Sequence, residues 1–457
     1  MKRFVLRIIS STVLVGVGAG LFVGNKVVFI DQERNLTSLL SPPIVKEDSL
    51  KESQASGQDM AKRIIEEGAV LLKNNGVLPL DPSNKEVNVF GWASIDWAYG
   101  ANSSSCSGRV MAEDSTRASL VDLYDALDAY GVEYNPALKQ MYASYFAPYV
   151  YATKDPGSVN NDNVITLHEP NIGDINYYTD ELLDDAFDFS DTAFVVITRN
   201  AGEDIPADRD MRKGGANAIS EPGKIYLDLS IEEEGLLRYV GETYENVVVI
   251  INSPAAMDLS FLNEIPGLDA ALQVGFTGTH GAEKIPALLY GDVSPSGRLA
   301  DTYAYDRNAS FAMRTKNPVS FSSGLSGKRF VEYVENIYVG YKWYETADAE
   351  GYWDGYSRTI LDENDNEIEV SGFDAVVQYP FGYGLSYASF SYGLEEVYFT
   401  KNNAKIPSLD KDGEIHFEVK VTNVSETTSK EVVEIYLEAP YTPGEIDFDD
   451  LFACRFG

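Results

Sequence analysis

Cysteine and histidine are scarce in this sequence of 457 residues. The two cysteines, Cys106 and Cys454, lie far apart and form no CxxC pair, which excludes a disulfide framework and leaves at most one bridge. The three histidines, His168, His280 and His416, are isolated, so their spacing indicates neither a His-containing catalytic triad nor an imidazole metal site. We therefore expect no metal and no cofactor, and any chemistry to come from carboxylates or other groups.

Basic residues are also few, with 36 Lys plus Arg against 71 Asp plus Glu and a formal net charge of −35. This surface would repel phosphate backbones and anionic lipid, so nucleic acid is not an expected partner. The acids are scattered rather than placed at metal-ligand spacings, which is typical of a charge that serves solubility. A neutral ligand such as a sugar suits this surface. The apolar content of 44% allows large cores, and the length suggests about two or three domains.

The N-terminus carries a targeting pattern. Lys2, Arg3 and Arg7 precede an apolar run over Ile8–Val23, which is a basic segment followed by a hydrophobic one. The run is close to the lower limit of the roughly 17 to 25 residues that span a bilayer, so a cleaved signal peptide of a secreted protein and an uncleaved anchor both fit. We favour residues 1–30 as a single anchor in the cell membrane with the body extracellular, because no A-x-A site follows and positive charges stay inside.

Short apolar runs alternate with helical patterns through the body of the chain. Strands are expected at Val87–Phe90, Ala193–Ile197, Val247–Ile251 and Ala270–Val274. Helices are expected at Ser56–Asn74, Ser115–Tyr130, Ile231–Tyr244 and Gly281–Leu289. This alternation predicts the α/β class, with a mostly parallel sheet sandwiched by helices over residues 31–390. A Tyr- and Asn-rich insertion near residues 134–179 is expected to cover one end of the sheet.

The composition changes again after Ser391. Two alternating runs, Glu414–Val421 and Glu431–Leu437, flank the polar segment Asn423–Ser429, a pattern that predicts an antiparallel hairpin. Residues 391–457 therefore suggest a truncated antiparallel β-sandwich of immunoglobulin or fibronectin type III kind, with about half of the strands that such a sandwich needs. The strand edges of such a region could be exposed and pair with a second copy of the chain, so a homo-oligomer is possible.

Carboxylates follow the strand expected at Ala193–Ile197. Ligands of open α/β sheets bind outside the carboxyl ends of the strands, where Arg199, Glu203 and Asp208 would lie. Cleavage of a glycosidic bond commonly needs two carboxyl groups, one of them a proton donor with a raised pKa. A loop of acids and arginines is also typical of a solvated, ion-paired rim. Both interpretations are open at this stage.

Four motifs between residues 67 and 387 resemble, in the expected order, those of glycoside hydrolase family 3, the β-glucosidase family. The motifs are Glu67–Asn74 followed by Leu78–Leu80, Gly291–Leu299, Tyr338–Tyr344 and Tyr379–Tyr387. Each alone is also a plausible turn or core segment, and the aromatic run Tyr341–Tyr344 is more typical of packing than of a sugar platform. Together they imply the α/β-sandwich domain of that family, followed by a fibronectin-like domain.

The resemblance also implies site residues and an activity. The acid/base of the family is a Glu on a loop of the form R-x-x-G-E, which Arg199, Gly202 and Glu203 match here. Asp204 stands where a Gly is common in the family. By this resemblance Glu203 is the catalytic candidate, Arg199 and Asp208 are candidate substrate-binding residues, and the reaction is retaining hydrolysis of β-glucosides or related glycosides.

The nucleophile of the family is an Asp of a TIM-type barrel, and the chain offers no length for a barrel of ~250 residues beside this sandwich. The resemblance therefore implies reversed domain order with the barrel absent, and a chain that supplies the acid/base domain of a larger enzyme. Two alternatives stay open. One is a non-catalytic, membrane-tethered carbohydrate-binding or interaction module, and the other is a membrane-anchored structural protein.

Overall fold

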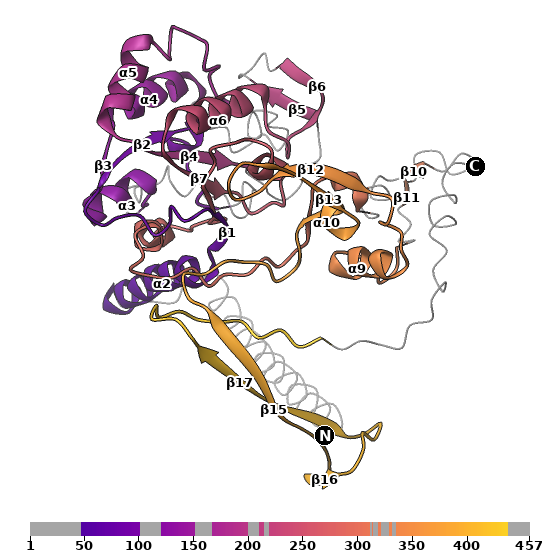
Figure 1. Ribbon diagram of the computed structural model, residues 1–457. Coiled ribbons are helices and arrows are strands. Elements are labelled where there is room, and N and C mark those ends of the chain that lie inside the picture. The colour runs from indigo at the N-terminus through magenta and orange to yellow at the C-terminus, as the bar shows by residue number, and fades with distance from the viewer. Residues whose placement is uncertain are drawn as a thin grey trace, which may run out of the picture. The chain divides into compact units, whose positions relative to one another are not determined.

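The central sheet has six strands in the order β1-β8-β7-β4-β2-β3 in the computed structural model, which describes residues 47–100, 120–150, 167–199, 210–213, 219–310, 313, 319–320, 329–330 and 335–436 (Figure 1). The strands are β1 Val70–Asn74, β2 Glu86–Phe90, β3 Glu133–Tyr134, β4 Thr192–Thr198, β7 Asn246–Asn252 and β8 Ala270–Gln273. All neighbouring pairs are parallel except β1 and β8, which run antiparallel. The prediction of an α/β fold with a mostly parallel sheet is confirmed.

Helices cover both faces of this sheet (Figure 1). They are α2 Glu47–Gly68, α3 Leu123–Tyr130, α4 Pro136–Val150, α5 Asp180–Phe189, α6 Ile231–Thr243 and α7 Ile285–Leu289. Because side chains alternate along a strand, Val195 and Val249 point into a core shared with α4, α5 and α6, whereas Val196 and Ile250 point into a core shared with α3 and α7. Burial on both faces explains the continuous apolar runs of β4 and β7.

The remaining helices and strands of the described residues lie outside the central sheet and the helices that cover it. They are η1 Trp92–Ser94, β5 Asp210–Lys213, β6 Ile219–Ile225, η4 Ser260–Asn263, η5 Gly281–Lys284, β9 Tyr303–Ala304, η6 Arg307–Ala309, β10 Val319–Ser320, β11 Arg329–Phe330, α9 Tyr341–Ala349, β12 Ser357–Leu361, β13 Glu367–Ser371, α10 Phe373–Val376, β14 Val377–Tyr379, β15 Phe390–Lys401, β16 Ala404–Ile406 and β17 Glu414–Asn423. Trp343 and Tyr344 of α9 are buried, so the packing interpretation of that aromatic run is confirmed. The helix predicted over Gly281–Leu289 is divided into η5 and α7.

The prediction of one helix over Ser56–Asn74 is wrong in its second half. Helix α2 ends at Gly68, and β1 begins at Val70 and pairs with β8. Leu71 and Leu72 are both buried but lie in the cores on opposite faces of the sheet. A helix would have placed these adjacent side chains only about 100° apart, whereas a strand sends them to opposite faces.

The hairpin predicted from Glu414–Val421 and Glu431–Leu437 is also wrong. Strand β17 pairs instead with β15, and Glu431–Tyr436, the part of the second run that the structure describes, forms no strand. One face of the sheet β16-β15-β17 carries a row of apolar cross-strand pairs, in which Tyr392, Leu394, Val397 and Phe399 lie opposite Val421, Val419, Phe417 and Ile415. Strand β15 has 12 residues and pairs with all ten residues of β17, which the second run does not.

Several sequence predictions concern residues that the structure does not describe. The expected anchor at residues 1–30 lies outside the described residues, as do Cys106 and Cys454. Among the residues that are described, no helix is both long and apolar enough to cross a membrane. The chain divides into two compact units, Met1–Asp59 and Met60–Gly457, and every contact discussed below lies within the second.

Candidate active site

The sheet changes direction between β2 and β4. The chain passes from β2 to β3 on one side and from β4 to β7 on the other, while β2 and β4 are themselves neighbours. Such a topological switch point opens a crevice at the carboxyl ends of the two strands, and it is where open α/β sheets bind ligands. The segments that follow Phe90 and Thr198 therefore border the candidate site.

Gly91 brings the turn after β2 close to β4. Its φ of +96° lies in the region that favours glycine, and a Cβ atom at this position would lie 2.4 Å from the carbonyl oxygen of Val196. The close approach needs a residue without a side chain. Trp92, which begins the short helix η1, is thereby held beside β4 at the switch point.

Arg199 follows β4 directly and is completely buried. Its two terminal nitrogens donate to both carboxylate oxygens of Glu233, at 2.8 and 2.6 Å. They also donate to the carbonyl oxygens of Thr198 at 2.6 Å and Asp228 at 2.7 Å. The guanidinium thus ties the end of β4 to the segment that leads into α6, and its terminal nitrogens bind protein groups.

Glu233 was not singled out from the sequence, although a local signal was present. Ser230 and Glu233 form a capping box at the start of α6, in which the Ser230 hydroxyl accepts from the Glu233 amide at 3.1 Å and the Glu233 carboxylate accepts from the Ser230 amide at 2.9 Å. The spacing S-x-x-E before an apolar run is the signature of this motif. The cap orients the carboxylate that receives Arg199.

Glu203 and Asp208 lie outside the described residues, which resume at Asp210 in β5. Their roles stay predictions. Of the three residues singled out from the sequence, only Arg199 is described, and it is placed at the carboxyl end of β4, four residues before Glu203.

Asn252 joins the carboxyl ends of three strands. At the end of β7, its side-chain oxygen accepts from the Ala98 amide at 2.7 Å, and its nitrogen donates to the carbonyl oxygens of Ala98 at 3.1 Å and Gly275 at 2.6 Å. Ala98 lies beyond β2 and Gly275 beyond β8. Sequence reasoning missed this residue, because a single Asn after a strand carries no distinctive pattern.

Glu169 contacts the turn after β2. Its carboxylate accepts from the Trp92 amide at 2.8 Å and from the hydroxyls of Tyr178 at 2.7 Å and Tyr142 at 3.2 Å. Burial, with a smaller contribution from the charge of Glu233, raises the pKa of Glu169 to about 8, against the lowering effect of these three donors. Sequence reasoning missed Glu169, because it lies 77 positions from Trp92 and no pattern links the two residues.

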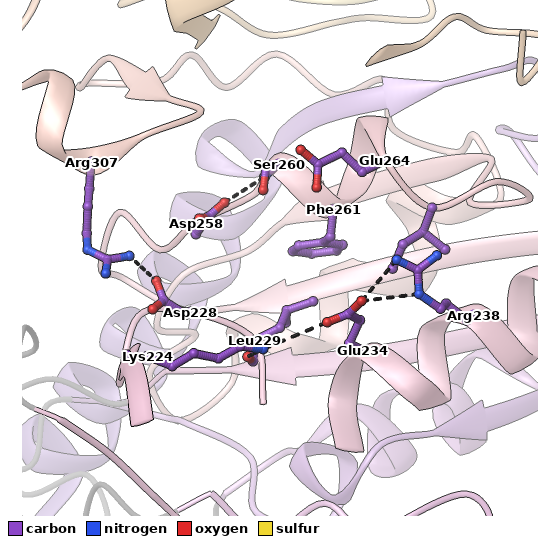
Figure 2. A pocket seen from close by; sticks show the side chains of 12 residues that line it. Lys224, Asp228, Leu229, Glu234, Arg238, Asp258, Ser260, Phe261, Glu264 and Arg307 are labelled. Carbon is purple, nitrogen blue, oxygen red and sulfur yellow. Dashed lines mark hydrogen bonds and ion pairs between the residues drawn. The ribbon is translucent and has the colours of Figure 1, made fainter. Parts of the chain in front are cut away.

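A cavity of about 280 Å³ is lined by residues that include Asp228, Glu234, Arg238 and Arg307 (Figure 2). Its lining includes Asp228, whose carbonyl oxygen binds Arg199 and whose carboxylate is paired with Arg307. Glu234 is likewise paired with Arg238, at 2.9 Å. Burial is the main cause of a raised pKa for Asp228. Charges of both signs line the cavity and pair with one another, which favours a neutral polar ligand over an ion.

Metal ligation finds no support within the described residues, where no group of three or more His, Cys, Asp or Glu is arranged to hold an ion. What the described part of the site offers is a strand exit held by a buried ion pair and a neighbouring turn held by a buried carboxyl group.

Comparison with known proteins identifies the family. The family model described as the glycosyl hydrolase family 3 C-terminal domain matches residues 69–387. A β-glucosidase of Ruminococcus albus is 30% identical over 385 residues, which cover 84% of this chain and 32% of that protein. β-Glucosidase A of Butyrivibrio fibrisolvens is 27% identical over 393 residues, covering 82% of this chain and 40% of that protein. The chain thus spans about a third of the length of these relatives.

Solved structures show the same fold. A β-glucosidase from Paenibacillus barengoltzii superimposes with a TM-score of 0.55 and 25% identity, covering 80% of this chain and 32% of that one. β-Glucosidase 3B from Thermotoga neapolitana, in complex with glucose, has a TM-score of 0.53 and 20% identity, covering 82% and 49%. With a family match over residues 69–387, this chain belongs to glycoside hydrolase family 3 as a bearer of its C-terminal domain.

Proposed function

We propose that this chain supplies the acid/base domain of a retaining glycoside hydrolase that acts on β-glucosides or related glycosides, with Glu203 as the acid/base. The observation that carries the proposal is the switch point. Glu203 stands four residues after Arg199, which the Glu233 carboxylate anchors at the carboxyl end of β4. Two β-glucosidases that align with more than four fifths of the chain support the substrate class.

The proposed reaction has two steps. In the first, the Glu203 carboxyl donates its proton to the glycosidic oxygen while the bond from that oxygen to C1 breaks and a carboxylate nucleophile bonds to C1. In the second, the Glu203 carboxylate takes a proton from a water molecule as the water oxygen bonds to C1, and the bond between C1 and the nucleophile breaks, which releases the sugar and the free nucleophile carboxylate. The family resemblance places the nucleophile on an Asp of a barrel domain, and we assign none in this chain. Arg199 and Asp208 stay candidates for sugar contacts, although the burial of Arg199 favours support of the strand exit.

The test uses a polypeptide that contains this chain together with a barrel domain of the family. We expect Glu203→Ala to lower hydrolysis of an unactivated β-glucoside by about 10² to 10⁴-fold. Azide should restore turnover of an activated aryl β-glucoside and yield a β-glycosyl azide of retained configuration. Glu242→Ala, on the exposed surface of α6, is the matched control. Wild-type turnover that Glu203→Ala leaves unchanged would contradict the assignment, and sugar binding without turnover would favour the carbohydrate-binding module.

We further propose that residues 1–30 anchor the protein in the cell membrane with its body outside. The proposal rests on the basic and apolar pattern of the N-terminus. Expression of the full chain should give a membrane fraction that resists alkaline carbonate extraction, and removal of residues 1–30 should abolish it. A cleaved, secreted product, recognised by N-terminal sequencing, would show a signal peptide instead.

A further inference from the structure

The segment over residues 134–179, which the sequence predicts to be an insertion, contributes three polar side chains to one point of the candidate site. Tyr142 comes from α4, and Glu169 and Tyr178 come from the segment that precedes α5. All three are buried, with exposed fractions of 0%, 7% and 2%. Such polar groups are seldom placed in a core unless they are hydrogen-bonded to one another, and here they are.

The Glu169 carboxylate is the centre of this group. One oxygen accepts from both tyrosine hydroxyls, at 2.7 Å from Tyr178 and 3.2 Å from Tyr142, and the two hydroxyls also contact each other. The other oxygen accepts from the backbone amide of Trp92 at 2.8 Å. Glu169 therefore links the two tyrosine hydroxyls to a single backbone atom, the amide nitrogen of Trp92, which directly follows Gly91.

That backbone atom borders the switch point. Gly91 approaches Val196 of β4 so closely that no Cβ fits, so a shift of Trp92 would move the chain beside the exit of β4. Glu169 also lies near enough to Glu233 to feel its charge, and Glu233 holds Arg199. Each of the two strand exits is thus held by a buried carboxyl group.

We propose that Glu169 is a positioning residue for the candidate site, which with Tyr142 and Tyr178 fixes the turn after β2 beside the exit of β4. The effect of Glu169 on catalysis rests on the proposed function, whereas its effect on the turn after β2 does not. The hydrogen-bonded group itself belongs to the fold and is open to test without any turnover. The role of the segment over residues 134–179 is then to hold the turn after β2 in place at the switch point.

The first experiment measures amide hydrogen exchange of the full chain. Glu169→Met keeps the length of the side chain and removes the acceptor, so exchange over Gly91–Ser94 should become at least ten-fold faster while β7 stays protected. Glu169→Gln retains an acceptor for the Trp92 amide and should restore most of the protection. The wild-type protection of this turn should change as pH passes through about 8, and that of Glu169→Gln should not.

Tyr244→Phe is the matched control, because this tyrosine lies in the same core and its hydroxyl has no hydrogen-bond partner within the described residues. Tyr178→Phe, which removes one donor to Glu169, should give an intermediate increase. The proposal is overturned if Glu169→Met changes exchange at the turn no more than Tyr244→Phe does. It is equally overturned if exchange rises uniformly through β4 and β7, since that would mean a loss of overall stability alone.

The second experiment measures activity in a polypeptide that contains this chain and a family barrel domain. If the wild type hydrolyses a β-glucoside, Glu169→Met should lower kcat/KM at least ten-fold and Glu169→Gln should stay within about three-fold of the wild type. Unchanged kcat/KM in Glu169→Met would overturn the positioning role in catalysis. A wild type without turnover would count against the proposed function, and the exchange measurement would still decide whether Glu169 positions the turn.

Discussion

Arg199 and Glu233 form a bidentate ion pair in which the side chains are 0% and 1% exposed. The two residues are 34 positions apart, and their contact joins the exit of β4 to the first turn of α6. Additional hydrogen bonds from Arg199 to two carbonyl oxygens and from the Ser230 amide to Glu233 satisfy most of the remaining polar groups. A pair of this kind cannot lose one member without leaving the other charge buried.

Removal of one partner should therefore be strongly destabilising. Glu233→Ala leaves the Arg199 guanidinium uncompensated in the core and removes the cap of α6, and we expect a loss of about 3–5 kcal/mol in the free energy of unfolding. The control is Arg238→Ala, which breaks the exposed pair with Glu234 on the same helix and should cost at most about 0.5 kcal/mol. Urea denaturation of both variants measures the two losses in the free energy of unfolding. Similar losses would contradict a structural role for the buried pair of Arg199 and Glu233.

Glu169 should make stability depend on pH. The pKa of this carboxyl is raised from an ordinary 4.5 to about 8 in the folded state, so the folded chain binds more protons than the unfolded chain between these values. The stabilisation is fully present below about pH 4.5 and is lost as pH rises through about 8. Between these limits, the free energy of unfolding should fall by up to about 1.4 kcal/mol per pH unit through this group.

The measurement is urea denaturation from pH 5 to 9, with Glu169→Gln as the comparison. Other titrating groups contribute equally to both proteins, so the difference between wild type and variant isolates Glu169. That difference should fall with rising pH and level off above about pH 8. A constant difference would show that the carboxyl is ionised throughout.

Gly91 should tolerate no side chain. Gly91→Ala combines a positive φ with a Cβ atom 2.4 Å from the Val196 carbonyl oxygen, and either the turn or β4 must shift. We expect a loss of about 2–4 kcal/mol in thermal or urea unfolding. Gly355→Ala is the control, because its Cβ would meet no atom within 4 Å, and it should change stability by less than about 1 kcal/mol.

Asn252 should be needed to hold the segment after β2. Asn252→Ala removes three hydrogen bonds and leaves the Ala98 amide without its acceptor, for an expected loss of about 2–3 kcal/mol. Asn176→Ala, whose side chain binds Asp174 in an exposed turn, should have a much smaller effect. Limited proteolysis near Tyr99 would report the release of the segment, and equal resistance of the two variants would refute this role.

The sequence was most informative where its signal is local or repeats along one element. The buried runs of β4 and β7, the helix over α6 and the four family motifs are all legible without a structure, because period and composition directly reflect burial. The same logic failed at residues 70–74, where a short apolar run fits a helix as well as a strand. It failed again at β17. The runs Glu414–Val421 and Glu431–Leu437 alternate equally well, and only the tertiary structure shows that β17 pairs with β15 rather than with the second run.

The sequence by itself determined the class of fold and the family, since these depend on patterns within each segment. Tertiary structure alone decided which side chains meet at the switch point. Glu169 reaches Trp92 across 77 positions, and Glu233 reaches Arg199 across 34, and nothing near either acid in the sequence indicates its partner. The physical reason is that such contacts arise only when strand order and helix packing bring distant segments together, so their energy belongs to the assembled core.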